Sequence, residues 1–264
     1  MSTPQIHESL QIEQRGQVHW LTLNRPERLN TLTEEMAAAL REYFYKQHRN
    51  PSCRVIVLQG AGKNFCAGFD IANVDTILGS NAAMLRTQTS YSDIVLAMRR
   101  CPQPIIALLQ GATTGGGFAM ALAADVRFAT EDARMNVAMA KVGLTGCDMG
   151  ISYHLPRIIG ASRAAEMMMT GRFCGAKKAA DIGLVSEVVT DLRAAGEALS
   201  EDMLKLSPLG LRLTKEGLNM ALSATSLEAA LVVEDRGQAL AMGASMKEGM
   251  NAFLEKRAPN YGDD

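Results

Sequence analysis

The pattern of apolar and polar positions in the first quarter of the chain predicts a hairpin, a helix and a buried strand. Residues 9–13 and 17–23 alternate on either side of a glycine-containing turn, which is typical of a β-hairpin. Thr33, followed by two glutamates, resembles a helix N-cap, and helical spacing continues to about His48. Arg54–Gly60 is a continuous apolar run bounded by turn residues, which indicates a buried parallel strand.

Two further apolar runs repeat this unit in the middle of the chain. Pro104–Gln110 predicts another buried strand, followed by a glycine-rich turn and an alanine-rich helix. Asp125–Thr130 predicts a third strand. The recurring order indicates a mixed α/β core of repeated ββα units.

Beyond about residue 190 the strand signals end and long amphipathic stretches indicate helices. These stretches are Asp191–Leu206, Gly210–Leu222, Ser226–Met242 and Ser245–Leu254. Pro208 and Gly210 mark the expected hinge. We therefore expect residues 1–206 to form the ββα core and residues 207–264 to form a helical region.

Composition and charge narrow the class of protein. With 47% hydrophobic and 21% charged residues among 264, the chain can bury a large core. The net charge is −1 and the lysines and arginines are dispersed, which argues against a nucleic-acid partner. No stretch approaches the roughly 18 apolar residues of a membrane span, and the N-terminus lacks the apolar segment of a signal peptide. A cytoplasmic location without a membrane partner is the expectation.

The five cysteines lack the paired spacing of zinc sites and the density of a disulfide framework. We expect reduced thiols that mostly pack in the core, and neither a metal nor a redox cofactor. Cys147 has no evident activating cation nearby in the sequence, so buried packing is favoured over reactivity for this thiol as well.

Two loops that follow buried strands carry the candidate chemistry. The first contains the run Phe65–Asp70 (FCAGFD), and the second contains Gly115–Gly117 just before the alanine-rich helix. Consecutive glycines at a helix start allow close backbone approach, and free N–H groups there point toward negative charge. Taken alone, three glycines are more often a tight turn that packs a helix against a sheet.

The string from Ile106 to Val126 resembles the full signature of the crotonase (enoyl-CoA hydratase/isomerase) superfamily. The resemblance extends over nearly the whole chain through LNRPERLNTLT at 23–33, FCAGFDI at 65–71, TGRFCGAKKAADIGLVSEVV at 170–189 and EGMNAFLEKRAP at 248–259. It implies a crotonase-type spiral of ββα units, an acyl-CoA substrate, and a homotrimer or dimer of trimers. It also implies that residues 207–264 mediate oligomerisation and cover the coenzyme A. A Rossmann-type dinucleotide site is disfavoured because the glycines are contiguous and not spaced as GxGxxG.

The resemblance also implies roles for individual residues. It places the two N–H donors to a thioester enolate on Phe69 and Gly116, and it makes Ile77–Tyr91 a loop that borders the acyl pocket. Coenzyme A is expected as part of the thioester substrate, with no separate cofactor. The residues expected to contact it are Arg28, Leu29, Ala67, Gly68, Asp70, Ile71 and Gly115.

The sequence departs from the family at the positions of the two hydratase glutamates, which here hold Ala119 and Met139. Neither side chain can transfer a proton, so ordinary hydration lacks both expected groups. Asp148 instead matches the aspartate that dienoyl-CoA and ring-epoxide isomerases of the family use as a proton shuttle. The family's 4-chlorobenzoyl-CoA dehalogenases place a nucleophile there, but the histidine and tryptophan that they require are missing from the corresponding positions.

The favoured reaction is therefore double-bond or related isomerisation with Asp148 as the shuttle. Alternatively, Asp148 caps the helix that follows it, because an Asp before a helix commonly accepts from first-turn amides. A rival reaction is hydration or hydrolytic C–C cleavage, with the water held by Asp148 or by another residue. A second rival is a catalytically silent acyl-CoA binder that keeps the fold after losing both glutamates. Asp75, Tyr153 and His154 are further candidates for catalytic groups.

Overall fold

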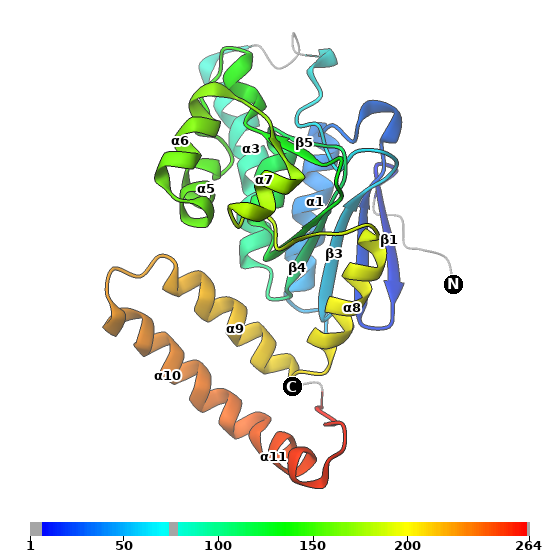
Figure 1. The fold of residues 1–264 in the computed structure, drawn as a ribbon, viewed down its shortest axis with the longest axis vertical. Coiled ribbons are helices and arrows are strands. Elements are labelled where there is room, and N and C mark those ends of the chain that lie inside the picture. Colours follow the sequence, from blue (N-terminus) through cyan, green and yellow to red (C-terminus); the bar gives the residue numbers. More distant parts are fainter. Residues whose placement is uncertain (1–6, 74–78, 263–264) are drawn as a thin grey trace.

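The computed structural model describes residues 7–73 and 79–262, which fold into two sheets surrounded by helices (Figure 1). The strands are β1 Leu10–Arg15, β2 Val18–Leu23, β3 Val55–Gly60, β4 Ile105–Leu109, β5 Ala112–Thr114, β6 Val126–Ala129, β7 Arg134–Asn136, β8 Cys174–Gly175 and β9 Glu187–Val188. The larger sheet has the order β1-β2-β3-β4-β6-β9, in which β1 and β2 are antiparallel and the other neighbours are parallel. The smaller sheet has the order β5-β7-β8. The predicted mixed α/β class is confirmed.

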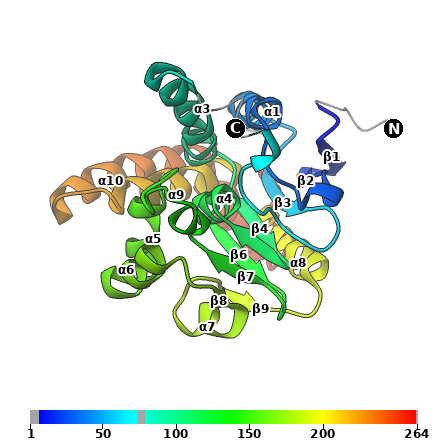
Figure 2. The same cartoon turned by 90° about the horizontal axis from the view of Figure 1, so that it is seen from above.

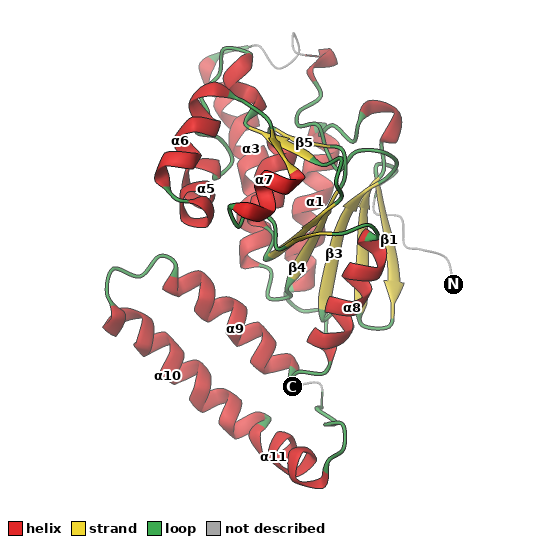
Figure 3. Ribbon diagram, in the orientation of Figure 1, coloured by secondary structure: helices red, strands yellow, loops and turns green. Residues whose placement is uncertain are grey.

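The helices cover both faces of the larger sheet and continue into a C-terminal extension (Figure 1 and, coloured by secondary structure, Figure 3). They are α1 Glu34–Gln47, α3 Asn81–Arg100, α4 Gly116–Ala123, α5 Ile151–Ile159, α6 Ala161–Thr170, α7 Ala176–Asp181, α8 Leu192–Leu204, α9 Pro208–Ala221, α10 Leu227–Ala244 and α11 Met246–Glu255. The 3-10 turns are η1 Pro26–Arg28, η2 Ile71–Asn73 and η3 Ala138–Lys141. The predicted N-cap of α1 is confirmed, because Thr33 Oγ1 accepts from Met36 N at 3.2 Å.

Alternate residues of the parallel strands pack into two separate hydrophobic cores, since successive side chains of a strand point to opposite faces. Leu58 and Ala107 belong to the larger core, which the sheet shares with α1, α3 and α4. Val57 and Leu108 belong to the smaller core, which is closed by apolar side chains of α8. Figure 2 shows α1 and α8 on opposite faces of the sheet. Burial on both faces explains why these strands read as continuous apolar runs.

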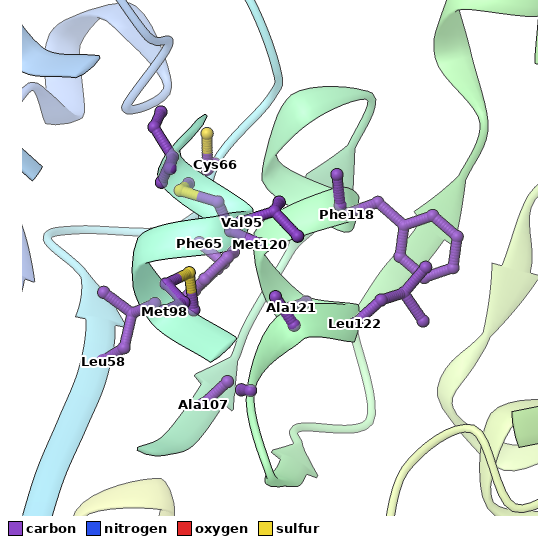
Figure 4. Packing of buried hydrophobic residues seen from close by; sticks show 14 of the residues in the cluster. Leu58, Phe65, Cys66, Val95, Met98, Ala107, Phe118, Met120, Ala121 and Leu122 are labelled. Atoms are coloured by element: carbon purple, nitrogen blue, oxygen red, sulfur yellow. The ribbon is translucent and has the colours of Figure 1, made fainter. Parts of the chain in front are cut away.

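Helix α4 lies at the centre of the larger core, and all of its residues are buried. Its side chains pack with Val95 and Met98 of α3 and with Leu58 and Ala107 of the sheet (Figure 4). A helix packed on every side cannot slide without opening cavities, which are costly. The position of its first residue, Gly116, is therefore fixed relative to the sheet.

The structure corrects the loop that was expected at Ile77–Tyr91. Residues 74–78 lie outside the described part of the chain, and from Asn81 onward the segment is the first half of α3. Ser80 caps this helix, because its Oγ accepts from Ala83 N at 3.3 Å. The buried residues of α3 begin only at Tyr91, so the preceding turns carry no apolar stripe from which to recognise a helix. The short strands β5, β7 and β8 were likewise not predicted, since two or three residues show no alternation.

The four predicted C-terminal helices are confirmed as α8 to α11, with bounds within two residues of those expected. Helix α9 begins at Pro208 after the N-cap Ser207, and α9 and α10 form a hairpin that projects from the core (Figure 1). The division into residues 1–206 and 207–264 stays a prediction. No helix in the described ranges is long and apolar enough to cross a membrane.

A buried asparagine joins two loops at the carboxyl end of the sheet. Asn30 is fully buried and donates hydrogen bonds to Ala61 O at 2.9 Å and Asn64 O at 2.7 Å. Its Oδ1 accepts from Arg25 N at 2.9 Å. Its φ of +54° lies in the left-handed region, which Asn tolerates better than most residues. The loop before α1 is therefore tied to the loop after β3.

Replacing Asn30 with alanine is expected to lower the free energy of unfolding by about 2–4 kcal/mol. The substitution removes three hydrogen bonds, leaves buried partners unsatisfied and places alanine at positive φ. Urea unfolding measures the loss. Asn24→Ala is the control, because Asn24 makes one long, exposed bond to Glu8 O, and it should cost about 0.5 kcal/mol or less. Equal losses in the two variants would contradict the anchoring role of Asn30.

Candidate active site

The loop at 65–71 pairs with the segment just before α1, and this pairing orients one backbone amide. Leu32 N donates to Gly68 O at 2.8 Å, and Asp70 N donates to Leu32 O at 3.0 Å. Because Gly68 O and Asp70 N both point toward Leu32, the N–H of Phe69 between them points away from Leu32. No hydrogen bond between described residues uses this N–H.

The second amide lies at the start of α4. Gly115 has φ +54° and ψ −124°, a conformation that is readily open only to glycine, and its N–H donates to Asn136 O at 3.2 Å. The chain thereby turns into α4 at Gly116, whose N–H has no intrahelical partner. None of the described carbonyl groups accepts from it.

Hydrogen bonds hold the two loops together. Thr114 N donates to Cys66 O at 3.0 Å, and Thr114 Oγ1 donates to Ala67 O at 2.9 Å. The approach is so close that a Cβ atom on Gly68 would lie 3.4 Å from Gly116 N. The structure therefore brings together the two loops that carry the predicted amide donors.

Apolar side chains surround Gly116. A Cβ atom at this position would lie 3.1 Å from Phe69 Cε1, 3.2 Å from Leu32 Cδ1 and 3.3 Å from Met149 Sδ. The ring of Phe69 in turn contacts that of Tyr91, with 4.4 Å between centroids. Any residue larger than glycine would displace these groups. Apolar walls lower the local dielectric, which strengthens hydrogen bonds from the free amides.

Asp148 adjoins this site through its neighbour Met149. Met149 and Gly150 have φ values of +42° and +78°, so two consecutive left-handed residues form the turn that precedes α5. Asp148 is half-buried, and its Oδ1 accepts a short hydrogen bond from Gln88 Nε2 of α3. Burial raises the pKa of Asp148, while the hydrogen bonds from Gln88 and from the Met149 N–H partly counter it. The net result is a carboxylate more basic than an exposed one.

The alternative in which Asp148 caps the following helix is wrong. The N-cap of α5 is Gly150, and the structure shows no side-chain cap bond there. Asp148 contributes its backbone carbonyl, which accepts from Ile151 N at 2.8 Å. The left-handed turn carries the side chain away from the first-turn amides and toward α3.

The residues predicted to contact coenzyme A lie on the paired loops at 25–32 and 65–71, except Gly115, which precedes α4. The two loops are also joined by a 3.0 Å bond from Ala67 N to Leu29 O. Three of these residues are exposed at the edge of the site, two are half-buried and the two glycines are buried. They are, in that order, Arg28, Leu29 and Ile71, then Ala67 and Asp70, then Gly68 and Gly115. Their role as ligand contacts stays a prediction.

The structure adds an ion pair that the sequence analysis missed. Asp70 Oδ2 lies 2.9 Å from Arg25 Nη2, and its Oδ1 lies 3.9 Å from Arg28 Nη2. Burial acts to raise the pKa of Asp70, but hydrogen bonds from Arg25 and the Ala72 N–H, with the charges of both arginines, hold it below its ordinary value. The sequence offered one signal for this pair. Asp70 and Arg25 carry opposite charges and lie on two loops that the family resemblance places together.

The positions of the two family glutamates hold apolar side chains within the core. Ala119 is fully buried in α4, and Met139 is 5% exposed in η3. Residue Ala138 of the same turn lies beside Gly115, 3.7 Å from where a Cβ would be. The paired carboxylates of a hydratase are therefore absent from both places.

Several further sequence-based expectations have mixed outcomes. Four cysteines are buried, but Cys147 is exposed, because it lies in the loop before α5 and outside the helix packing.

The remaining catalytic candidates lie away from the two amides or outside the described residues. His154 and Tyr153 line a cavity between α5 and α9. Asp75 lies outside the described residues. Within the described ranges, no three metal-binding side chains gather into a cluster.

Comparison with known proteins identifies the family. The model of the enoyl-CoA hydratase/isomerase family matches residues 13–264. The chain is 40% identical to the probable enoyl-CoA hydratase EchA12 of Mycobacterium tuberculosis, over 95% of this chain and 91% of that protein. It is 35% identical to the 1,2-epoxyphenylacetyl-CoA isomerase of Escherichia coli, over 91% of this chain and 93% of that enzyme.

A solved structure confirms the predicted crotonase-type fold. The crystal structure of a probable enoyl-CoA hydratase/isomerase from Mycobacterium abscessus superposes with a TM-score of 0.90 at 35% identity. The match covers 97% of this chain and 99% of that one. On its sequence, its fold and the pairing of its two glycine loops, the chain belongs to the enoyl-CoA hydratase/isomerase family.

Proposed function

We propose that this protein is an acyl-CoA isomerase that forms a thioester enolate and moves a proton with Asp148 as the shuttle. The observation that carries this proposal is the meeting of two loops with unused N–H groups, at Phe69 and Gly116, beside a half-buried carboxylate. The apolar residues at both glutamate positions favour isomerisation over hydration. The likeness to a protein named as an isomerase supports the same choice.

The two amides act as an oxyanion hole in this proposal. When a proton leaves the carbon next to the thioester carbonyl, negative charge collects on the carbonyl oxygen. Donors that already point at that oxygen stabilise the transition state more than the substrate, and each can contribute about 3 kcal/mol. The glycine conformations fix both donors before the substrate binds, so no reorganisation is required during the reaction.

Asp148 removes the proton and returns it at another carbon, which leaves the mass of the substrate unchanged. Its raised pKa makes it a stronger base than an exposed aspartate, as proton abstraction next to a carbonyl requires. Gln88 donates to Asp148 Oδ1 and so holds the carboxylate in a fixed orientation beside the site. A single carboxylate suffices because the two proton transfers occur one after the other.

Coenzyme A is proposed as part of the substrate and binds along the loops at 25–32 and 67–71. Asp70 engages Arg25 directly, whereas Arg28 lies 3.9 Å from it and has a half-exposed side chain. Arg28 is therefore the better placed of the two arginines to meet a phosphate group of the ligand.

The protein is also proposed to assemble as a homotrimer or a dimer of trimers. Helix α10 has no buried residue, although much of its length is apolar. Exposed apolar side chains on α10 and α11 include Leu231, Val232, Leu240, Met250, Phe253 and Leu254. An exposed apolar surface of this extent on two consecutive helices is typical of a face that is buried on association.

The isomerase proposal is tested by incubating the protein with a panel of acyl-CoA thioesters in deuterated water and reading the products by mass spectrometry. We expect deuterium incorporation or isomer formation in the wild type. Asp148→Asn should lower the rate about 100-fold or more, because the amide cannot accept the proton. Glu131→Gln, an exposed acid in the loop after β6, is the control and should retain the wild-type rate.

Other outcomes separate the competing reactions. A product heavier by one water would support hydration instead. Full activity in Asp148→Asn would remove the aspartate from the mechanism. Tight binding with no exchange into any thioester would leave a silent acyl-CoA binder.

The contact from Gln88 is expected to set the pKa of Asp148. Gln88→Met removes a hydrogen bond that lowers this pKa, so the pKa should rise further and the acid limb of the pH–rate profile should move to higher pH. Carbon-13 NMR of labelled aspartate measures the pKa independently of turnover. Thr89→Met, on the next position of α3, serves as the control. An unchanged pKa in Gln88→Met would show that the contact does not tune the carboxylate.

The assembly proposal predicts that charge on the outer face of α10 dissociates the oligomer. Leu231→Glu combined with Met242→Glu places two carboxylates on that face, because the two residues are about three helical turns apart and both are exposed. Burying these carboxylates without partners is costly. Size-exclusion chromatography with light scattering should show a trimer or hexamer for the wild type and a monomer for the variant. Gln14→Glu adds charge at an exposed position of β1, away from α10, and should leave the mass unchanged. A monomeric wild type would contradict the proposal.

A further inference from the structure

A cavity of about 970 Å³ lies between α3, α5, α9 and the end of α4. Its apolar lining includes Val95, Leu122, Met149 and Ile158. Met149 belongs to both this cavity and the active site, since its sulfur lies 3.3 Å from the Cβ position of Gly116. The cavity therefore begins where the wall of the active site ends, and Met149 separates the two.

Positive charge is in excess at the far end of this cavity. Asp125 lies 3.0 Å from Arg99 Nη1 and 2.9 Å from Lys215 Nζ. Arg127 is nearby as well, and its hydrogen bonds to described residues all go to backbone carbonyls. Three cations thus share one carboxylate, although Lys215 is only 6% exposed.

The surrounding groups do not cancel this excess. Arg157 lies over the ring of Tyr153, 3.7 Å from its centroid, and donates to Tyr153 O at 2.8 Å. Burial lowers the pKa of His154 to about 4, helped by the charges of three arginines, so this histidine is neutral. The remaining acid of the lining is the exposed Glu216. The potential at this end is positive.

An occupant that matches the cavity has an apolar body and an anionic end. Buried cations without enough counter-charge are unfavourable, and a carboxylate would compensate them through charge-assisted hydrogen bonds. The helix rise over α4, from Gly116 to Ala123, gives a span of about 10 Å between the active site and the cations. An extended chain of roughly eight to ten carbon atoms covers that distance.

We propose that the cavity beyond Met149 takes the distal part of an acyl chain that ends in a carboxylate. The substrate class is then the mono-CoA thioester of a medium-chain dicarboxylic acid, with its free carboxylate among Arg99, Arg157 and Lys215. Met149 is the residue that the chain must pass. This inference rests on the proposed acyl-CoA function and names the acyl group that the site selects.

Calorimetric binding of two thioesters of equal length tests the proposal. Decanedioyl-CoA, with a free terminal carboxylate, should bind the wild type about tenfold or more tightly than decanoyl-CoA, as one charge-assisted hydrogen bond allows. Arg157→Met should reduce this preference to about threefold or less. Arg163→Met removes an exposed arginine of α6 outside the cavity and should leave the preference intact. The ratio within each variant is independent of small losses in stability.

Equal affinity of the wild type for both thioesters would overturn the proposal, and so would an undiminished preference in Arg157→Met. The binding of free decanoate is measured as well, because a free fatty acid also combines an apolar chain with a carboxylate. If decanoate binds without competing with decanedioyl-CoA, the cavity is a separate fatty-acid site and the proposal is wrong. The binding assay does not depend on turnover. If the protein prefers the dicarboxylic thioester but has no isomerase activity, the proposed reaction is refuted and this inference stands.

Discussion

The close approach of two glycine loops is the constraint on which the rest of the site depends. A Cβ atom on Gly117 would lie 2.3 Å from Cys66 O, so nothing larger than glycine allows the loops to meet at this distance. The bond from Thr114 N to Cys66 O then sets the register between them. Because α4 is buried along its whole length, its packing and this contact fix the amide of Gly116 relative to the sheet. The free donors are a consequence of core packing and backbone geometry, not of particular side chains.

The difference between one carboxylate and two decides which chemistry such a scaffold favours. Adding water across a double bond requires a base for the water and an acid for the carbon, so two groups must be in place together. Moving a proton between carbons separates these tasks in time, and one carboxylate can perform both. Ala119 and Met139 remove the paired arrangement, while burial keeps Asp148 basic enough to accept a proton. The proposed isomerisation follows from this division of roles.

The elements dominated by local pattern could be predicted from the sequence, whereas contacts between distant polar groups could not. Continuous apolar runs located the buried strands, and Thr33 located the start of α1. The apolar residues in the first half of α3 are the contiguous run 82–85 and form no helical stripe, so the helix and its contact from Gln88 to Asp148 could not be predicted. Those two residues are 60 positions apart, and no periodicity links them. The predicted roles of Phe69 and Gly116 came from resemblance, since glycine runs alone do not distinguish a turn from a donor site.

Met149 links catalysis to the choice of substrate in a way that neither feature shows alone. Its N–H bonds to the Asp148 carboxylate, and its left-handed φ of +42° stores strain that the surrounding packing must hold. Its sulfur meanwhile separates Gly116 from the charged cavity. A substitution that reshapes the passage for the acyl chain therefore also disturbs the turn that orients the base. Acyl-chain selectivity and the basicity of Asp148 cannot be changed independently at this position, whereas the cations at the far end, which lie on other elements, can vary without affecting the turn.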